Sequence, residues 1–346
     1  MTSTYATLAF LSEPEEYDSL TRVNLETIEK ARGRISGVVK NTPLVHSTFL
    51  SKLCKGYVYL KLENQQVTNS FKLRGALNRM SCLSTEERTR GIVTASTGNH
   101  ALGVAFSSMH LGVPAKIVVP SNVSETKLSR LREFEVQVIQ EGEFDEIEQR
   151  ARGFAAEEGL TYVSPYSDVE IISGQGTIGL EILEVLDNVD LLTAPVGGGG
   201  LVSGIAVAVK SLSPSTEVVG VQVFGISTMH DSWQAGRIVH PKEKHTLADG
   251  ILGGLEDGAM TFDIVMKHVD DFHLIREETV KQAIRLLWEH EKQTVEGAGA
   301  IAIGPILEDP EHFNGKTVVA VISGGNIEAG LHRRIVSEAD WPAGGG

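Results

Sequence analysis

Short runs rich in β-branched residues alternate with longer helical patterns along most of this chain, and this alternation constrains the fold more than any other feature. Helical spacing is clearest in residues 279–292, where apolar residues recur at i, i+3, i+4, i+7 and i+8. Strands that alternate with helices form parallel sheets, and runs that are apolar throughout suit a sheet covered on both faces. We therefore expect an α/β fold with parallel-rich sheets flanked by helices. The expected strands are 91–95, 116–119, 136–139, 161–163, 190–194, 218–223 and 317–322.

The length of the chain, 346 residues, corresponds to roughly two domains at about 150 residues each. An acidic helical stretch at 142–158 is followed by the irregular segment Ser-Pro-Tyr-Ser-Asp at 164–168. A boundary at this segment separates a small α/β unit from the rest of the chain. We predict a small domain over residues 81–168 and a large domain formed by residues 1–80 and 169–346.

The composition indicates a soluble globular protein and excludes several classes of partner. With 31 basic and 45 acidic residues the formal net charge is −14, so we expect no binding to nucleic acid or to an anionic membrane surface. No apolar run reaches the ~18 residues of a membrane span, and residues 1–16 lack the basic residues of a secretory signal. Cys54 and Cys82 are too few for a disulfide framework or a thiolate zinc site. We therefore predict a cytoplasmic protein.

Three loops between an expected strand and an expected helix carry candidate chemistry. Four consecutive glycines, Gly197–Gly200, leave backbone N–H groups bare at the positive end of a helix, which suits a phosphate; the alternative is a flexible turn. The loop Ser96–His100 offers two hydroxyls and free N–H groups, which suit a carboxylate; ordinary helix capping is the alternative. The third loop is Ser323–Asn326, in which Ser323 is also a possible cap.

A single lysine and a glycine pattern need separate interpretation. Lys72 follows a bulky aromatic residue, Phe71, at an expected helix start, where burial and a positive field lower the pKa of an amine enough for Schiff-base formation. The alternative is a surface lysine on an amphipathic helix. The segment Gly174–Gly179 matches G-x-G-x-x-G, but no acidic residue closes a strand about 20 residues later. We predict a tight helix start there rather than a nicotinamide site.

Taken together, these segments resemble the pyridoxal-phosphate enzymes of fold type II, specifically the threonine/serine dehydratase and serine racemase family. The resemblance extends from about residue 28 to about residue 330. The matching motifs occur in the same order along the chain and are Ser70–Ala76, Ser96–His100, Gly197–Gly200 and Ser323–Asn326, with 42–44, 174–177 and 248–250 also fitting.

The resemblance implies that pyridoxal 5′-phosphate lies between the two domains, and it implies a role for each matching residue. Lys72 would hold the cofactor and later move the Cα proton, and Thr97 occupies the position of the second acid/base group of serine racemases. Phe71 would pack beside the ring, Asn99 would hydrogen-bond the ring 3′-oxygen, and Ser323 would face the pyridine nitrogen. The phosphate would be held by Gly197, Gly198, Gly199, Gly200 and Leu201, the pocket would include Tyr166, and the substrate carboxylate would be held by Ser96, Thr97, Gly98, Asn99 and His100.

The implied reaction is dehydration and deamination of a β-hydroxy amino acid, of the L-threonine or L-serine type, to a 2-oxo acid and ammonia. The alternatives are an amino-acid racemase, a dehydratase for 3-hydroxyaspartate, a nicotinamide oxidoreductase using Gly174–Gly179, and a non-catalytic amino-acid sensor. We expect a small amino-acid substrate and a homo-oligomer, a dimer by resemblance. We expect no metal, because Gln222 stands where serine racemases and many relatives have a glutamate, and residues 221–228 contain no carboxylate.

Overall fold

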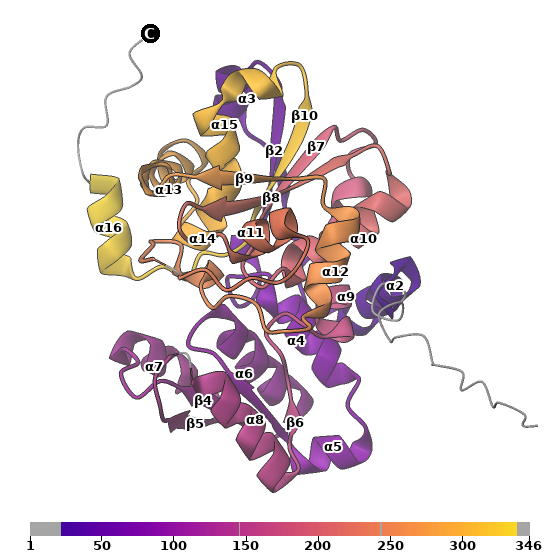
Figure 1. Ribbon diagram of the computed structural model, residues 1–346, viewed down its shortest axis with the longest axis vertical. Helices are drawn as coiled ribbons and strands as arrows, with labels where there is room; N and C mark the ends of the chain where they lie inside the picture. The colour runs from indigo at the N-terminus through magenta and orange to yellow at the C-terminus, as the bar shows by residue number, and fades with distance from the viewer. Residues whose placement is uncertain (1–21, 145, 243, 338–346) are drawn as a thin grey trace, which may run out of the picture.

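The computed structural model describes residues 22–144, 146–242 and 244–337. The predictions made for the first 16 residues lie outside these ranges. Two sheets organise the described chain (Figure 1). The first has the strand order β1-β2-β10-β7-β8-β9 and is parallel except for the antiparallel pair β1–β2. Its strands are Leu44–His46 (β1), Tyr57–Leu62 (β2), Leu191–Pro195 (β7), Glu217–Val223 (β8), Asp271–Ile275 (β9) and Thr317–Ile322 (β10).

The second sheet is entirely parallel and has the order β5-β4-β3-β6. Its strands all lie within the segment predicted as the small domain, whereas the strands of the first sheet lie outside it. The boundaries at residues 80/81 and 168/169 themselves remain a prediction. The strands of the second sheet are Ile92–Ala95 (β3), Ala115–Val119 (β4), Gln137–Gln140 (β5) and Thr161–Tyr162 (β6).

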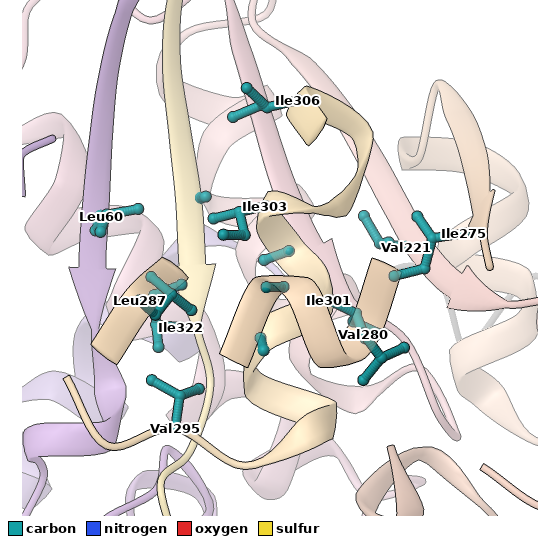
Figure 2. Close-up of a cluster of buried hydrophobic side chains, with 14 of the residues drawn as sticks. Leu60, Val221, Ile275, Val280, Leu287, Val295, Ile301, Ile303, Ile306 and Ile322 are labelled. Carbon is teal, nitrogen blue, oxygen red and sulfur yellow. The ribbon is translucent and has the colours of Figure 1, made fainter. Parts of the chain in front are cut away.

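Helices cover both faces of each sheet. In β10, Val318, Ala320 and Ile322 face one cluster of buried apolar side chains, which includes residues of α13–α15 (Figure 2), while Val319 and Val321 face a second cluster with residues of α9 and α10. Burial on both faces is why this strand is apolar at every position after its first. The helices are α2 (Leu25–Ile35), α3 (Thr48–Cys54), α4 (Lys72–Ser81), α5 (Thr85–Arg90), α6 (Asn99–Leu111), α7 (Glu125–Leu131), α8 (Ile147–Glu158), α9 (Val169–Leu183), α10 (Gly200–Leu212), α11 (Thr228–Ala235), α12 (Met260–His268), α13 (Glu277–Glu291), α14 (Gly297–Ala300), α15 (Gly304–Glu308) and α16 (Ala329–Ser337).

All seven expected strands are present within one residue at each end, but β1, β2 and β9 were not predicted. The sequence of β2, YVYLKL, includes a lysine, and that of β9, DFHLI, includes an aspartate and a histidine. Polar residues of this kind mask a strand in a pattern analysis unless their tertiary partners are known. None of the helices within the described residues is long and apolar enough to cross a membrane.

The prediction of a tight helix start at Gly174–Gly179 is wrong. Helix α9 begins at Val169, where the Asp168 side chain accepts hydrogen bonds from two backbone N–H groups, and the glycines lie inside the helix. A Cβ on Gly174 would stand 2.7 Å from the carbonyl oxygen of Arg74, and one on Gly176 would stand 2.9 Å from that of Gly204. The glycines therefore allow α9 to pack closely against α4 and α10. A buried helix interior offers no free N–H groups to a dinucleotide.

Candidate active site

A cavity of about 540 Å³ is lined by residues from both sheets and their connecting loops. This volume lies within the range of about 300–1,000 Å³ that holds small-molecule ligands. The structure brings every site residue predicted from the sequence to this cavity, and their individual roles remain predictions. The residues are Phe71, Lys72, Ser96, Thr97, Gly98, Asn99, His100, Tyr166, Gly197, Gly198, Gly199, Gly200, Leu201 and Ser323.

Lys72 is the first residue of α4, and the chain reaches it through a tight turn. Asn69 adopts a left-handed backbone conformation (φ 55°), which asparagine tolerates better than most residues. The Phe71 N–H then donates to the Ser323 carbonyl at 3.0 Å, so the lysine segment is tied directly to the loop after β10. The Lys72 Nζ donates to the Pro165 carbonyl at 2.7 Å and lies 5.2 Å from the centre of the Phe71 ring.

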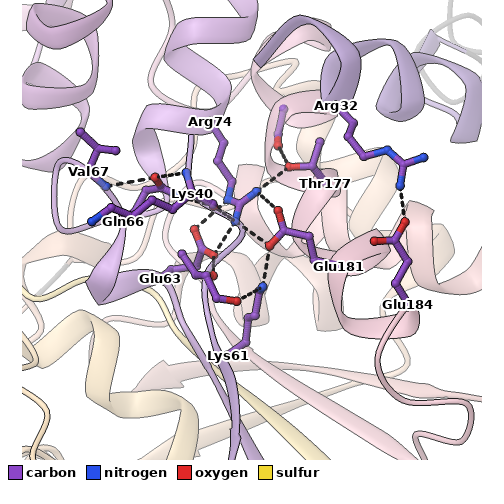
Figure 3. Close-up of polar contacts among 12 residues, drawn as sticks. Arg32, Lys40, Lys61, Glu63, Gln66, Val67, Arg74, Thr177, Glu181 and Glu184 are labelled. Carbon is purple, nitrogen blue, oxygen red and sulfur yellow. Dashed lines mark hydrogen bonds and ion pairs between the residues drawn. The ribbon is translucent and has the colours of Figure 1, made fainter. Parts of the chain in front are cut away.

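A buried ion network anchors helix α4 through its residue Arg74 (Figure 3). The guanidinium of Arg74 binds both carboxylate oxygens of Glu63 and both of Glu181, with N···O distances of 2.6–2.9 Å. Lys61 donates to Glu181 at 2.5 Å and completes a set of two positive and two negative charges. Burial opposes ionisation of Glu63, but attraction and hydrogen bonds from Arg74 outweigh it and lower the pKa of Glu63. The network joins α4, which starts with Lys72, to β2 and α9.

The glycine loop forms a cradle at the start of α10. Gly199 has a φ of 86°, which favours glycine, and a Cβ on Gly198 would stand 2.5 Å from the Tyr166 ring. Any larger residue at position 198 would therefore force the ring to move. The first turn of a helix leaves its backbone N–H groups without helical partners and carries a partial positive charge. This cradle fits the phosphate of pyridoxal phosphate.

The Ser96–His100 loop leads from β3 into α6, again at a helix N-terminus. Burial, together with the charge of Lys72, lowers the pKa of His100 to about 3, so its imidazole is neutral. The His100 Nε2 faces the Thr94 hydroxyl at 3.0 Å and the Val163 carbonyl at 3.3 Å. A neutral ring gives no ion pair, so any binding of a carboxylate by this loop depends on its N–H groups and hydroxyls.

Sequence reasoning missed one buried carboxylate in the cavity, Glu296. Its Oε1 accepts a hydrogen bond from the Asn99 Nδ2 at 2.5 Å. Burial, with a contribution from Asp249, raises the pKa of Glu296 to about 7, although its hydrogen bond from Asn99 opposes the shift. The sequence does contain one indication of its importance, because Glu296 is the single charged residue in the otherwise apolar, glycine-rich segment 295–307.

Two further predicted residues differ in how firmly the structure holds them. The Tyr166 hydroxyl accepts from the Glu256 N–H at 2.9 Å, which fixes the ring against the glycine loop. The Ser323 hydroxyl makes one long contact, 3.5 Å to the Ala298 carbonyl. A hydroxyl in this place can donate to a pyridine nitrogen, but it lacks the negative charge that would stabilise a pyridinium.

Gln222 is buried at the position where the resemblance predicted a lost metal ligand. Its Nε2 donates to the Val196 carbonyl at 3.1 Å, and its Oε1 accepts from the His230 N–H at 2.8 Å. Both ends of the amide are therefore used by the protein. No group of three or more histidine, cysteine, aspartate or glutamate side chains placed to hold a metal occurs within the described residues.

Activity is expected to survive treatment with a chelator. Because a neutral amide already bonded at both ends is a poor ligand for a hard divalent cation, removal of Mg²⁺ or Ca²⁺ should change the turnover rate by less than about twofold. The measurement is the initial rate after dialysis against a chelator, with and without added Mg²⁺. A rate that collapses in the chelator and returns with Mg²⁺ contradicts this expectation.

Comparisons with known proteins agree with this geometry. The family described as "Pyridoxal-phosphate dependent enzyme" matches residues 35–324. The L-threonine ammonia-lyase of Thermotoga maritima is 44% identical over 317 residues, covering 91% of this chain and 79% of the relative. The catabolic L-threonine dehydratase TdcB of Escherichia coli K12 is 37% identical over 321 residues, covering 92% of this chain and 97% of the relative.

Solved structures give the same result for the fold. Maize serine racemase superposes with a TM-score of 0.86 at 30% identity, covering 90% of this chain and 96% of that one. The processed form of threonine deaminase isoform 2 from Solanum lycopersicum superposes with a TM-score of 0.86 at 31% identity, covering 97% of this chain and 93% of that one. The predicted fold class and the predicted cofactor are thereby confirmed. With a family match over most of its length and relatives this similar across nearly the whole of it, the chain belongs to the pyridoxal-phosphate dependent enzymes.

Proposed function

We propose that this protein is an ammonia-lyase that converts a β-hydroxy amino acid, of the L-threonine or L-serine type, to a 2-oxo acid and ammonia. One observation carries the proposal: the amine of Lys72 lies in the same cavity as the glycine loop Gly197–Gly200, to which we assign the phosphate, and the loop Ser96–His100, to which we assign the substrate carboxylate. The names of the relatives from Thermotoga maritima and Escherichia coli support the same reaction and favour L-threonine as the first substrate to test.

In the proposed mechanism the protein supplies position and proton transfer. Pyridoxal phosphate, when bound, provides the electron sink that makes the substrate Cα proton removable. With the cofactor bound, the glycine cradle would hold its phosphate and Ser323 would face its pyridine nitrogen, while the Ser96–His100 loop would hold the substrate carboxylate. Lys72 would be the residue that attaches the cofactor in the absence of substrate. Once free, the Lys72 amine would take the Cα proton and could pass it to the departing β-hydroxyl, which would leave as water.

The rate of cofactor uptake is expected to rise with pH up to about 8 and then level off. Covalent attachment needs the neutral amine of Lys72, and burial lowers the pKa of Lys72 to about 8, although the nearby carboxylate of Glu296 opposes this shift. At about pH 7.5 roughly a quarter of such amines are neutral, compared with about one in a thousand for an ordinary lysine. The measurement is the rate at which apoprotein develops the absorbance of the bound cofactor, with acetyllysine amide as the unburied control. A rate that tracks the control at every pH contradicts the assignment.

A substrate panel tests the proposed reaction. Holoenzyme is incubated with L-threonine, L-serine or 3-hydroxyaspartate, and ammonia, 2-oxo acid and the D-enantiomer are measured together. Equal release of ammonia and 2-oxo acid supports the lyase. Formation of D-serine faster than pyruvate overturns it in favour of a racemase, and release from 3-hydroxyaspartate alone would change the substrate class. A protein that binds the cofactor but turns over none of these compounds is a sensor.

Thr97 is expected to limit racemisation. Racemisation needs an acid/base group on the cofactor face opposite Lys72, and such a group acts only within about 3 Å of the proton that it transfers. The methyl group of threonine restricts χ1 and crowds that face. Thr97→Ser should therefore raise the ratio of D-serine to pyruvate, whereas Thr97→Ala should abolish any D-serine and leave pyruvate formation within about threefold. Loss of pyruvate formation in Thr97→Ala would contradict this division of roles.

We further propose that the enzyme works in the cytoplasm as a homodimer with a small domain at 81–168 and a large domain at 1–80 and 169–346. The acidic composition supports the cytoplasmic location, and the resemblance supports the homodimer. The position of the second sheet within 92–162 supports the domain division. Light scattering on the holoenzyme tests the oligomeric state, and limited proteolysis near the proposed boundaries tests the domain division.

A further inference from the structure

Asn326 ends a motif that the sequence analysis singled out without giving this residue a role. Its side chain lies between the segment before Lys72 and the start of α6, two parts of the chain that both border the cavity. We infer that Asn326 is a positioning residue that fixes which end of the Asn99 amide faces the cofactor ring. This inference rests on the proposed function, because only the resemblance assigns to Asn99 a hydrogen bond with the 3′-oxygen of the cofactor ring.

The orientation of the Asn326 amide follows from its partners. Its Nδ2 lies 2.9 Å from the carbonyl oxygen of Thr68, which can only accept, so the nitrogen and not the oxygen must face Thr68. The same nitrogen lies 2.7 Å from the side chain of Asn99. The atom of Asn99 that faces it must therefore be the acceptor Oδ1. Both hydrogens of the Asn326 Nδ2 are then donated, one to the Thr68 carbonyl and one to the Asn99 Oδ1.

The other end of Asn99 faces Glu296, and the orientation fixed by Thr68 and Asn326 turns its Nδ2 toward this carboxyl group. Its Nδ2 donates to the carboxylate of Glu296 at 2.5 Å. The amide of Asn99 is therefore held from both sides, by a donor on Asn326 and by an acceptor on Glu296. One N–H of its Nδ2 remains for a ligand. An ionised ring oxygen can only accept hydrogen bonds, so this orientation offers it a donor, and the flipped amide would offer it a second acceptor.

The surrounding chain leaves the network little freedom to rearrange. A Cβ on Gly324 would stand 2.3 Å from the Glu296 Oε1 and 3.2 Å from the Asn99 Nδ2, so only glycine fits beneath these groups. The Asn326 backbone is held as well, because its carbonyl accepts from the Arg130 guanidinium at 3.3 Å. Asn326 does not cap the next helix, since α16 begins three residues later and the amide is already bonded elsewhere.

Replacement of Asn326 by aspartate tests the inference most sharply. An aspartate would set oxygen against both the Thr68 carbonyl and the Asn99 Oδ1. If Asn99 turned its amide to relieve this repulsion, its oxygen would face Glu296. Asn326→Ser serves as the second variant, because it removes the amide nitrogen without adding a charge. The matched control is Asn314→Asp, which adds the same charge at an exposed asparagine remote from the cavity lining.

The probe is pyridoxal phosphate itself, and the readouts are its dissociation constant from apoprotein and the ratio of its visible absorbance bands at a fixed pH. Asn326→Asp is expected to weaken binding at least tenfold, and Asn326→Ser about threefold or more. In both variants the band ratio should shift toward the form with a protonated ring oxygen, while Asn314→Asp stays within about twofold of the original protein in binding and keeps its spectrum.

Two results overturn the inference. One is a folded Asn326→Asp or Asn326→Ser protein, judged by its thermal unfolding midpoint, that keeps the original affinity and band ratio. The other is an Asn314→Asp protein that shows the same losses. Failure of the proposed function is a separate result, because the unmodified protein would then bind the cofactor and release no ammonia from any amino acid in the panel.

Discussion

Replacing Lys72 with alanine is expected to abolish both covalent cofactor binding and turnover. Lys72 is the lysine whose buried amine lies in the cavity beside the phosphate cradle, and its burial lowers its pKa to about 8. Among the described residues that line the cavity, no other side chain combines a primary amine with burial, since Lys127 is exposed at the rim and pairs with Asp249 at 3.4 Å. We expect the rate to fall by at least about 10³-fold, because a nucleophile and a general base are lost together.

The measurement has two parts, the visible absorbance of the reconstituted protein and the rate of ammonia release. Lys281→Ala is the matched control, because this lysine is exposed on α13 and does not line the cavity. Reduction of the unmodified holoenzyme with borohydride, followed by peptide mapping, identifies the modified lysine directly. Label on any residue other than Lys72 would show that the assignment is wrong, whatever the activity of the alanine variant.

The second large effect is expected from Arg74→Met. This substitution removes the guanidinium that binds Glu63 and Glu181 and leaves two buried carboxylates with Lys61 as their remaining positive partner. Breaking a buried ion network on one side costs about 3–5 kcal/mol, because the charges left behind have lost both water and partner. Since α4 starts with Lys72, the variant should also bind the cofactor more weakly. The thermal unfolding midpoint and the cofactor dissociation constant are the measurements.

Arg32→Met is the matched control for this experiment. Arg32 pairs with Glu184 at the end of α9, as Figure 3 shows beside the buried network. Both side chains are about half exposed (46% and 54%). Exposed pairs contribute about 0–1 kcal/mol, so its loss should hardly move the unfolding midpoint. Equal effects of the two substitutions would contradict the claim that burial makes the Arg74 network different.

Much of the candidate site was predictable because its residues sit in short local motifs. The glycine loop, the Ser96–His100 loop and the Ser323 loop each follow an apolar strand and precede a helix, so the end of a parallel sheet gathers them. Lys72 was identified from a local motif of another kind, a lysine that follows a bulky aromatic residue at an expected helix start. The roles that we propose for Glu296 and Asn326 rest only on the structure, because a role that consists of holding another side chain leaves no local pattern in the sequence.

The sequence by itself determined the α/β class, the family and the groups that form the cavity, because strand periodicity, glycine loops and the lysine motif are properties of neighbouring residues. It could not determine which long-range partners make polar residues tolerable in the interior. Tertiary structure alone decided that Lys61 belongs to a strand, since its charge is compensated by Glu181, 120 residues later. It also decided that the glycines of 174–179 lie inside α9, since their use is contact with α4 and α10. In both cases the deciding energy comes from contacts between segments distant in the chain.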